Sequence, residues 1–295
     1  MNRREFLKSA AASVGAMAVG GLDADDGKPS FYGPTIRDRL WMWGHHPDSV
    51  SAGRNGFKPG QVSIDQAAAC QLMGIPNDCV IRWCNLPRHP WGDYFEQFRK
   101  LKRFSFGIAD GADGSVQDKM KIAFEELQPN YPNLTGCFLD DFFINKRLYM
   151  EPDQLRKVAA DVHARGLRLS VVLYADQKGI QPEFKPHVDL CDEISFWFWR
   201  GDSLGTMEAN VRKCRDFIGE GKDLLLGLYM WDFSCSQAMS EARMGSQLDV
   251  ARRLLADRTV SGLIFHPSFV ADLDLPSVRL AKRWIKEYGE SRWGA

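Results

Sequence analysis

The stretch Gly136-Cys137-Phe138-Leu139-Asp140-Asp141-Phe142-Phe143 leads an apolar run directly into two adjacent carboxylates. Burying an ionised Asp costs several kcal/mol unless the charge is paired or solvated. Neighbouring carboxylates also repel, so the pKa of at least one should rise, which is how a carboxylic acid stays neutral at pH 7. A turn or a helix cap is the alternative interpretation, because Asp favours both. The rest of the chain decides between them.

Apolar or aromatic runs alternate with helical patterns along the chain. We expect eight strands, each such a run, at 39–47, 79–85, 104–110, 136–141, 167–176, 193–200, 224–232 and 262–267. We expect helices after them, at about 63–73, 91–102, 115–127, from 152 onward, and at 182–190, 206–219, 236–256 and 277–288. Steady alternation of strand and helix is typical of a parallel sheet buried on both faces.

Eight strand–helix units of this length fit a (β/α)8 TIM barrel. We therefore expect a single catalytic domain over residues 29–295. A doubly wound open sheet is the alternative. No G-x-G-x-x-G or Walker sequence follows any run, which disfavours the nucleotide-binding form of that fold.

The N-terminus carries a targeting pattern. Arg3-Arg4-Glu5-Phe6-Leu7-Lys8 precedes an Ala/Gly/Val run that continues to about Gly21. This resembles a bacterial twin-arginine export signal, and the apolar run is too short and Gly-rich to span a membrane stably. We expect residues 1–28 to be a signal peptide and tether, the export machinery to be a partner, and the protein to be periplasmic or secreted. A basic amphipathic surface helix is the alternative.

The charge balance and the cysteine spacing argue against several classes of binding function. Basic and acidic residues balance at 38 each, so charge indicates neither a nucleic acid nor an anionic membrane as partner. The seven Cys include no C-x-x-C pair, and no close Cys/His spacing suits zinc. We expect no nucleic-acid partner, no stable membrane span and no cofactor.

Polar and ionisable residues recur where the predicted strands end. Active sites of (β/α)8 barrels lie at the C-terminal ends of the strands, so these residues form a candidate site. They are His45, His46, Arg82, Asp110, Asp140, Asp141, Tyr174, Asp176, Arg200, Tyr229, Asp232 and His266. A purely structural protein needs no such bias, which favours an enzyme.

Aromatic residues follow the same pattern, at Trp43, Trp83, Trp197, Trp199, Tyr229 and Trp231. Their rings could stack on the faces of a sugar, or they could simply fill the barrel core. We expect about half of them to be core. We also expect Trp91 to be exposed, and His163 and His187 to lie on the surface.

A carboxylic acid at the end of the fourth strand suits cleavage of a glycosidic bond. That reaction requires an acid to protonate the leaving oxygen and a second group to stabilise the developing positive charge. Adjacent strand residues point to opposite faces, but both can reach a pocket where the strand frays. We expect Asp141 to be the general acid, with Asp140 positioning the substrate or setting the pKa of Asp141.

A fourth strand that ends in Asp-Asp resembles the catalytic strand of the retaining O-GlcNAcase and hyaluronidase-like hexosaminidases, which are barrel enzymes. The resemblance implies that Asp140 orients a 2-acetamido group that acts as nucleophile, and that Asp141 is the general acid and base. More broadly, the chain resembles exported, glycoside-hydrolase-like barrel proteins. It implies an oligo- or polysaccharide substrate.

Other assignments stay open. Without an acetamido sugar, Asp176 or Asp232, with Asp110 behind them, could supply the second carboxylate. Arg82 and Arg200 could hold a uronic acid or neutralise the Asp pair. A metal-dependent hydrolase or isomerase would use His45 or His46, Asp140 and His266. A barrel that binds sugar without cleaving it is the third hypothesis.

Overall fold

The computed structural model describes residues 31–50, 56–58 and 60–295. The barrel belongs to the compact unit Thr35–Ala295. The predicted export signal and tether, 1–28, fall outside the described residues. Among those described, no helix is long and apolar enough to cross a membrane.

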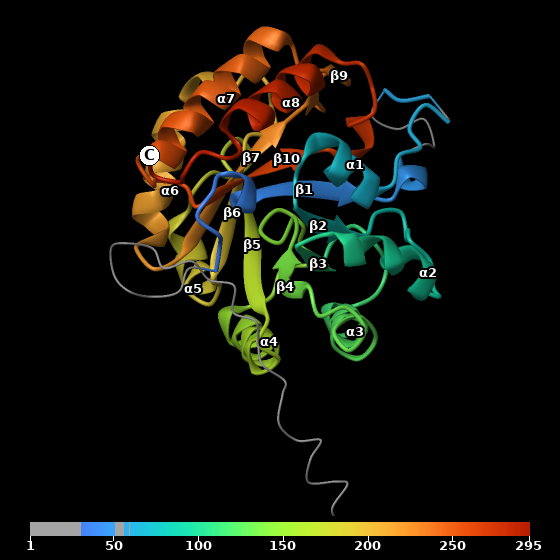
Figure 1. The fold of residues 1–295 in the computed structure, drawn as a ribbon. Helices are drawn as coiled ribbons and strands as arrows, with labels where there is room; N and C mark the ends of the chain where they lie inside the picture. The colour runs from blue at the N-terminus through green and yellow to red at the C-terminus, as the bar shows by residue number, and fades with distance from the viewer. Residues whose placement is uncertain (1–30, 51–55, 59) are drawn as a thin grey trace, which may run out of the picture. The chain divides into compact units, whose positions relative to one another are not determined.

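Eight parallel strands close into a barrel (Figure 1). They are β1 (Leu40–His45), β2 (Asn77–Ile81), β3 (Arg103–Ala109), β4 (Leu134–Leu139), β5 (Arg168–Tyr174), β6 (Glu193–Trp197), β7 (Asp223–Tyr229) and β10 (Gly262–His266). The barrel closes because β1 pairs with both β2 and β10. The predicted (β/α)8 barrel is confirmed, and the open doubly wound sheet is wrong.

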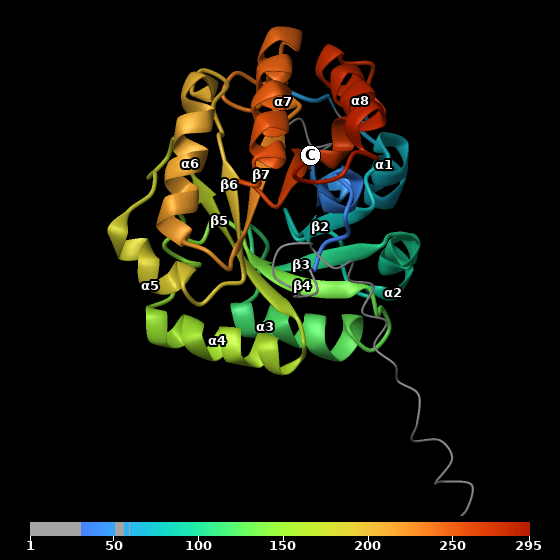
Figure 2. The ribbon, with the colours of Figure 1, turned by 60° about the vertical axis from the view of Figure 1, so that its left-hand side comes forward.

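Helices surround the strands on the outside of the barrel (Figure 2). They are α1 (Gln66–Met73), α2 (Gly92–Phe95), α3 (Val116–Lys121), α4 (Pro152–Ala164), α5 (Lys185–Val188), α6 (Met207–Ile218), α7 (Glu241–Ala256) and α8 (Pro276–Tyr288). Side-chain caps fix where some of the helices begin. The Asp65 carboxylate caps α1 by accepting a hydrogen bond from Ala68 N at 2.7 Å, and Ser115 caps α3 in a capping box. Gly74 ends α1 in the left-handed region, at φ 72°.

The seventh unit departs most from the predicted boundaries. The strand expected at 224–232 divides into β7 and the short β8 (Trp231–Asp232), which pairs antiparallel with β9 (Gln237–Ala238). Because β9 occupies these residues, the helix expected from 236 begins only at Glu241. The Ser240 hydroxyl caps it by accepting a hydrogen bond from Arg243 N at 3.3 Å.

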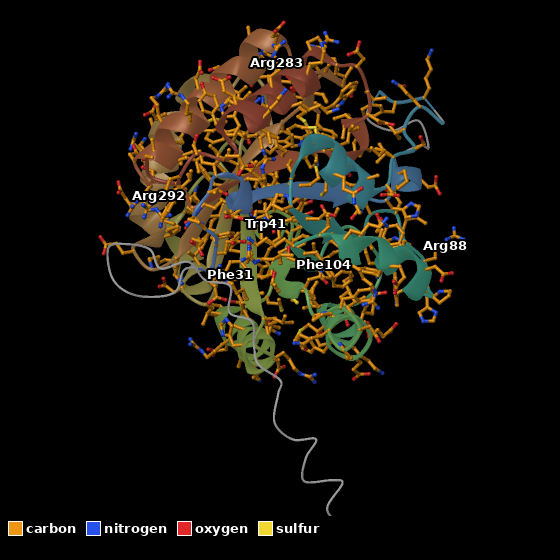
Figure 3. The ribbon with its side chains drawn as sticks, viewed as in Figure 1. Phe31, Trp41, Arg88, Phe104, Arg283 and Arg292 are labelled. Atoms are coloured by element: carbon orange, nitrogen blue, oxygen red, sulfur yellow. The ribbon has the colours of Figure 1, made fainter. Side chains whose placement is uncertain are left out.

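Two glycines make room for tryptophans near the C-terminal end of the barrel. A Cβ at Gly227 would lie 2.0 Å from the Trp197 ring, and one at Gly111 would lie 2.2 Å from the Trp83 ring. Only glycine therefore lets these rings take their places. Figure 3 shows how the side chains are distributed over the fold: Trp41 is buried in the interior, and Arg283 lies at the surface.

Two residues predicted to be exposed are buried. Trp91 packs under the Arg82 guanidinium, whose Cζ lies 4.6 Å from the ring centroid. His187 is also buried, and its Nε2–H donates a hydrogen bond to Met150 O at 2.9 Å. Each side chain has a specific contact inside the protein, Trp91 with the Arg82 cation and His187 with the Met150 carbonyl, which the sequence pattern does not reveal.

A buried ion pair joins β3 to α3. The Lys119 ammonium contacts the Asp110 carboxylate, and their side chains are 1% and 0% exposed. Lys119 also donates to Ala112 O at 3.0 Å, and Asp110 accepts hydrogen bonds from Arg82 N at 3.2 Å and Ala112 N at 3.0 Å. Asp110 thus anchors the loop that follows β3.

We predict that Lys119→Met lowers the free energy of unfolding by about 3–5 kcal/mol, because it leaves the Asp110 charge buried and unpaired. Urea denaturation measures the change. Lys121→Met is the matched control on the same helix, since the Lys121 side chain is 70% exposed, and it should cost less than about 1 kcal/mol. Equal losses in the two variants would contradict this role for the pair.

Candidate active site

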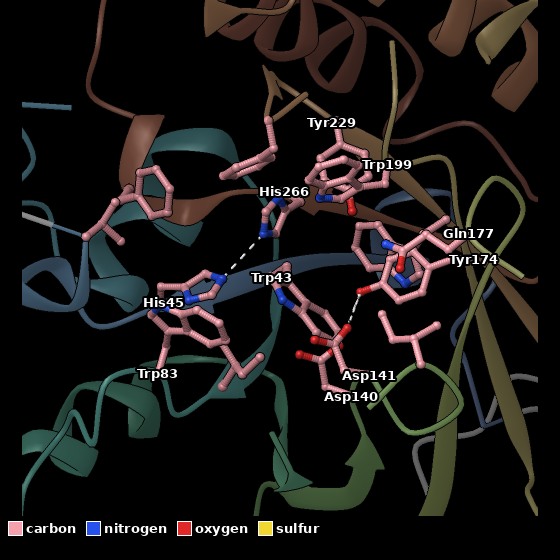
Figure 4. A pocket seen from close by; sticks show the side chains of 16 residues that line it. Trp43, His45, Trp83, Asp140, Asp141, Tyr174, Gln177, Trp199, Tyr229 and His266 are labelled. Atoms are coloured by element: carbon pink, nitrogen blue, oxygen red, sulfur yellow. Dashed lines mark hydrogen bonds between the residues drawn. The ribbon is translucent and has the colours of Figure 1, made fainter. Parts of the chain in front are cut away.

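A cavity of about 330 Å³ opens at the C-terminal ends of the strands (Figure 4). Its size lies at the lower end of small-molecule pockets, roughly 300–1,000 Å³. Several residues predicted from the sequence line it together: Trp43, His45, Trp83, Asp140, Asp141, Tyr174, Trp199, Tyr229 and His266.

A sharp turn brings both carboxylates into this cavity. Asp140 continues the barrel pairing of β4, because its N–H donates to Ala109 O at 2.8 Å. Asp141 then takes a left-handed conformation, with φ at 53°. Its carbonyl accepts hydrogen bonds from Ile144 N at 3.1 Å and Asn145 N at 2.8 Å. The predicted turn is confirmed, and it is what places two adjacent side chains in one pocket.

One hydroxyl serves both acids. Tyr174, at the end of β5, lies 2.9 Å from Asp141 Oδ1 and 3.5 Å from Asp140 Oδ1, measured from its Oη (Figure 4). A phenol has a single proton to donate, so it stabilises one ionised carboxylate at a time. The shorter distance favours Asp141.

Burial raises the pKa of both acids. Asp140 is 6% exposed, and burial, followed by the nearby Asp141 and Asp110 charges, raises its pKa well above the ordinary Asp value. Burial also raises the pKa of the half-buried Asp141, while the Tyr174 hydrogen bond opposes that rise. A carboxylic acid kept neutral in this way can donate a proton.

A pair of histidines forms another part of the wall. His45 Nε2, at the end of β1, lies 3.4 Å from His266 Nε2, at the end of β10. Burial lowers the pKa of His45 to about 3, and burial with the neighbouring His45 lowers the pKa of His266. The rings of Tyr229 and Phe233 pack against the His266 ring, with centroids 5.0 Å away. Both imidazoles are therefore neutral near pH 7.

The histidines and the carboxylates lie on opposite sides of the barrel. Around the closed sheet the order is β1-β10-β7-β6-β5-β4-β3-β2. In this ring β10, which carries His266, stands opposite β4, which leads into Asp140 and Asp141. Likewise β1, which carries His45, stands opposite β5, which carries Tyr174. The cavity thus has an acidic wall and an imidazole wall.

Aromatic rings separate the two walls. The Trp43 ring centroid lies 5.1 Å from that of Trp197 and 4.8 Å from that of Phe138, and Trp197 lies 5.4 Å from Tyr229. All four rings are buried, as core rings are, and Trp43, Trp197 and Tyr229 also line the pocket. Trp199 differs, because it is 38% exposed. It is the ring most open to a bound molecule.

Other predicted site residues do not line the cavity. His46 stacks on Tyr94, with ring centroids 5.0 Å apart, and Trp231 packs on Phe57 at 4.2 Å. Arg82 covers Trp91, and Asp110 is held by Lys119, as described above.

The remaining three predicted residues also have structural partners elsewhere. Asp176 accepts hydrogen bonds from Arg200 N at 2.7 Å and Ser203 Oγ at 3.1 Å. The Arg200 guanidinium pairs with Asp202 at 2.7 Å. Asp232 is buried and pairs with Arg243 at 3.0 Å. A second carboxylate at Asp176 or Asp232, and a uronic acid held by Arg82 and Arg200, have no support in this geometry.

The sequence missed several lining residues, namely Val50, Ile81, Ile144, Gln177, Phe233 and Phe269, and Trp197 was noted only as an aromatic ring. Most are apolar and come from loops, where no periodic pattern marks them. Gln177 is the exception, because it directly follows the predicted fifth strand and is polar.

The described residues contain no group of three or more His, Cys, Asp or Glu side chains arranged to hold a metal ion. The trio proposed from the sequence, His45 or His46 with Asp140 and His266, therefore does not form such a group. The two walls of the cavity hold these residues apart.

No family model and no curated relative matches the chain. Solved structures do. A putative alpha-L-fucosidase from Bacteroides thetaiotaomicron has a TM-score of 0.58 at 12% identity, over 90% of this chain and 100% of that chain. A GH99 endo-alpha-mannosidase from the same organism has a TM-score of 0.55 at 9% identity, over 86% and 98%. These similarities show that the chain shares the barrel fold of proteins described as glycosidases.

An inhibitor protein is also similar. The xylanase-alpha-amylase inhibitor protein XAIP-I, solved with trehalose, has a TM-score of 0.53 at 12% identity, over 85% of this chain and 98% of that chain. Barrels of this shape therefore include proteins described as inhibitors as well as glycosidases. Function has to be argued from the site.

We predict that Asp140→Asn raises the melting temperature by a few degrees at pH 7. The amide keeps the shape of the side chain but removes the cost of ionising a buried acid. Because the pKa of Asp140 is raised in the folded state, this gain should shrink as the pH falls towards about 4, where the unfolded carboxyl is also protonated. Differential scanning calorimetry measures it.

Asp161→Asn, on the exposed face of α4, is the matched control and should leave the melting temperature unchanged at both pH values. A lower melting temperature for Asp140→Asn at pH 7 would show that the Asp140 charge is well solvated or paired in the folded protein.

Proposed function

We propose that this protein is a glycoside hydrolase that cleaves an oligo- or polysaccharide by general acid catalysis. The single observation that carries the proposal is the acid pair, Asp140 and Asp141, held with raised pKa values in an aromatic cavity at the C-terminal end of the barrel. The similarity to structures described as glycosidases supports the same class of reaction. The twin-arginine pattern at residues 1–28 supports a periplasmic or secreted location.

Asp141 is the general acid in this proposal. Asp141 is less buried than Asp140, and its Oδ1 accepts a hydrogen bond from the Tyr174 hydroxyl. Its protonated carboxyl donates to the glycosidic oxygen as the bond to the anomeric carbon breaks. The carboxylate left behind is stabilised by the Tyr174 hydroxyl. Asp140 keeps the pKa of the pair high and orients the sugar.

The aromatic rings supply sugar binding. Trp43 and Trp197 form apolar surfaces deep in the cavity, and Trp199 offers an exposed ring where the rest of the substrate would leave the pocket. Stacking on such rings binds the C–H faces of a sugar, while neighbouring polar groups take its hydroxyls.

A sugar-binding barrel without catalysis is the second candidate, and the similarity to an inhibitor protein solved with trehalose favours it. In that case the Asp pair would only accept hydrogen bonds from sugar hydroxyls. Binding without turnover, with Asp variants that change affinity alone, would identify this function.

We predict that Asp141→Asn lowers kcat by at least about 100-fold, the scale of a positioned general acid. The assay uses the chain from Pro29 onward with aryl glycosides, N-acetylhexosaminides and uronides, with and without EDTA. Asp161→Asn serves as the surface control and should retain full activity. Undiminished turnover by Asp141→Asn would refute the acid assignment, and EDTA-sensitive turnover restored by a divalent ion would favour the metal-dependent alternative.

We predict that Tyr174→Phe shifts the alkaline limb of the pH profile of kcat/KM to higher pH. Activity requires protonated Asp141, so it falls as the pH rises through the raised pKa of that acid. The Tyr174 hydroxyl stabilises the ionised carboxylate, and removing it raises the pKa of Asp141 further. An alkaline limb that stays in place or moves to lower pH would show that another group controls it.

A further inference from the structure

The two carboxylates of the site cannot flank a glycosidic bond. They belong to adjacent residues, and one Tyr174 hydroxyl reaches both, at 2.9 Å and 3.5 Å. Glycosidases that use two carboxyl groups place them on either side of the scissile bond, as acid and base or as acid and nucleophile. Asp140 therefore approaches the sugar from the same side as Asp141. The group that assists attack on the anomeric carbon must come from elsewhere.

No further carboxylate of the described residues lines the cavity. Asp176 is held by Arg200 N and Ser203, and Asp232 by Arg243. The wall opposite Asp141 carries His45 and His266 instead, because β10 and β4 stand across the barrel from each other. These are the two proton acceptors available on that side.

The histidine pair has the geometry of a water-binding site. Its Nε2 atoms are 3.4 Å apart, which is long for a direct N–H···N bond. One water can lie about 2.9 Å from both nitrogens, accepting a hydrogen bond from one Nε2–H and donating to the lone pair of the other. Both Nδ1 atoms are buried without a partner among the described residues, so no neighbour fixes which ring carries the Nε2 proton.

We propose that His45 and His266 hold and deprotonate the water that attacks the anomeric carbon from the face opposite Asp141. This inference rests on the proposed glycosidase function. The water oxygen forms the new bond to the anomeric carbon, and its proton passes to the unprotonated Nε2. The glycosidic C–O bond breaks, and its oxygen takes the proton of Asp141. Exchange with solvent then returns the imidazolium and the carboxylate to their starting states.

This arrangement makes the enzyme inverting, because water enters opposite the leaving group in a single displacement. The first test uses the unmodified protein and the glycoside it turns over fastest, with the anomer released first identified by proton NMR before it equilibrates. The inverted anomer is expected. The retained anomer would overturn the inference while leaving the glycosidase function intact, and would favour a nucleophile on the substrate such as a 2-acetamido group. Absence of turnover on every glycoside would overturn both.

The second test uses azide, a nucleophile that needs no deprotonation. His266→Ala should lower kcat at least about 100-fold, and azide should restore release of the aglycone with formation of the inverted glycosyl azide. Asp141→Asn is the matched control, because azide does not replace a missing acid and should give no such rescue. A merely structural role for His266 predicts a loss that azide does not reverse. Where His266→Ala does not fold, His45→Gln takes its place, with the same loss and rescue expected.

Discussion

The site depends on the burial of Asp140 beside Asp141 under a single shared hydroxyl. Burial makes ionisation of either acid costly, and each charge makes the other costlier. Tyr174 relieves that cost for one carboxylate, and its shorter contact selects Asp141. From this constraint follows the expected instability of the ionised pair. In the proposed mechanism, the same constraint sets the separate roles of the two acids and provides the proton for the leaving group. Keeping two carboxyl groups buried side by side lowers the stability of the folded protein, a cost that is common at functional sites.

Closure of the barrel is the second feature on which the site depends. Eight parallel strands present all their C-terminal ends at one rim, and the closed ring sets strand opposite strand. The acids at the end of β4 therefore face neutral imidazoles on β1 and β10, rather than another acid. Gly227 and Gly111 complete the pocket, because side chains there would displace Trp197 and Trp83. The asymmetry of the cavity is thus a consequence of topology together with two positions that tolerate no side chain.

The alternation of apolar runs and helical patterns was enough to predict the barrel and the rim on which the site lies. Strand ends also pointed to Asp140, Asp141, Tyr174, His45 and His266, because the period of a strand and its terminus are local properties. Pairing between distant residues is not local. Nothing near Asp232 in sequence indicates that Arg243 will hold it, and nothing near Asp110 singles out Lys119 from the other cations of its helix. The loop residues Phe233 and Phe269 carry no periodicity at all, so their place in the cavity follows only from the fold.

The central claim is that the carboxyl pair holds a proton far above the ordinary Asp pKa of about 3.9. An infrared titration of the carboxylic acid C=O stretch tests it most directly, taken as the difference between the unmodified protein and Asp140→Asn. Other buried acids, such as Asp78, then cancel. The account predicts a protonated carboxyl band in the difference spectrum that persists well above that ordinary value. A difference spectrum that shows no protonated carboxyl there would mean that Asp140 holds no proton, and would contradict the account.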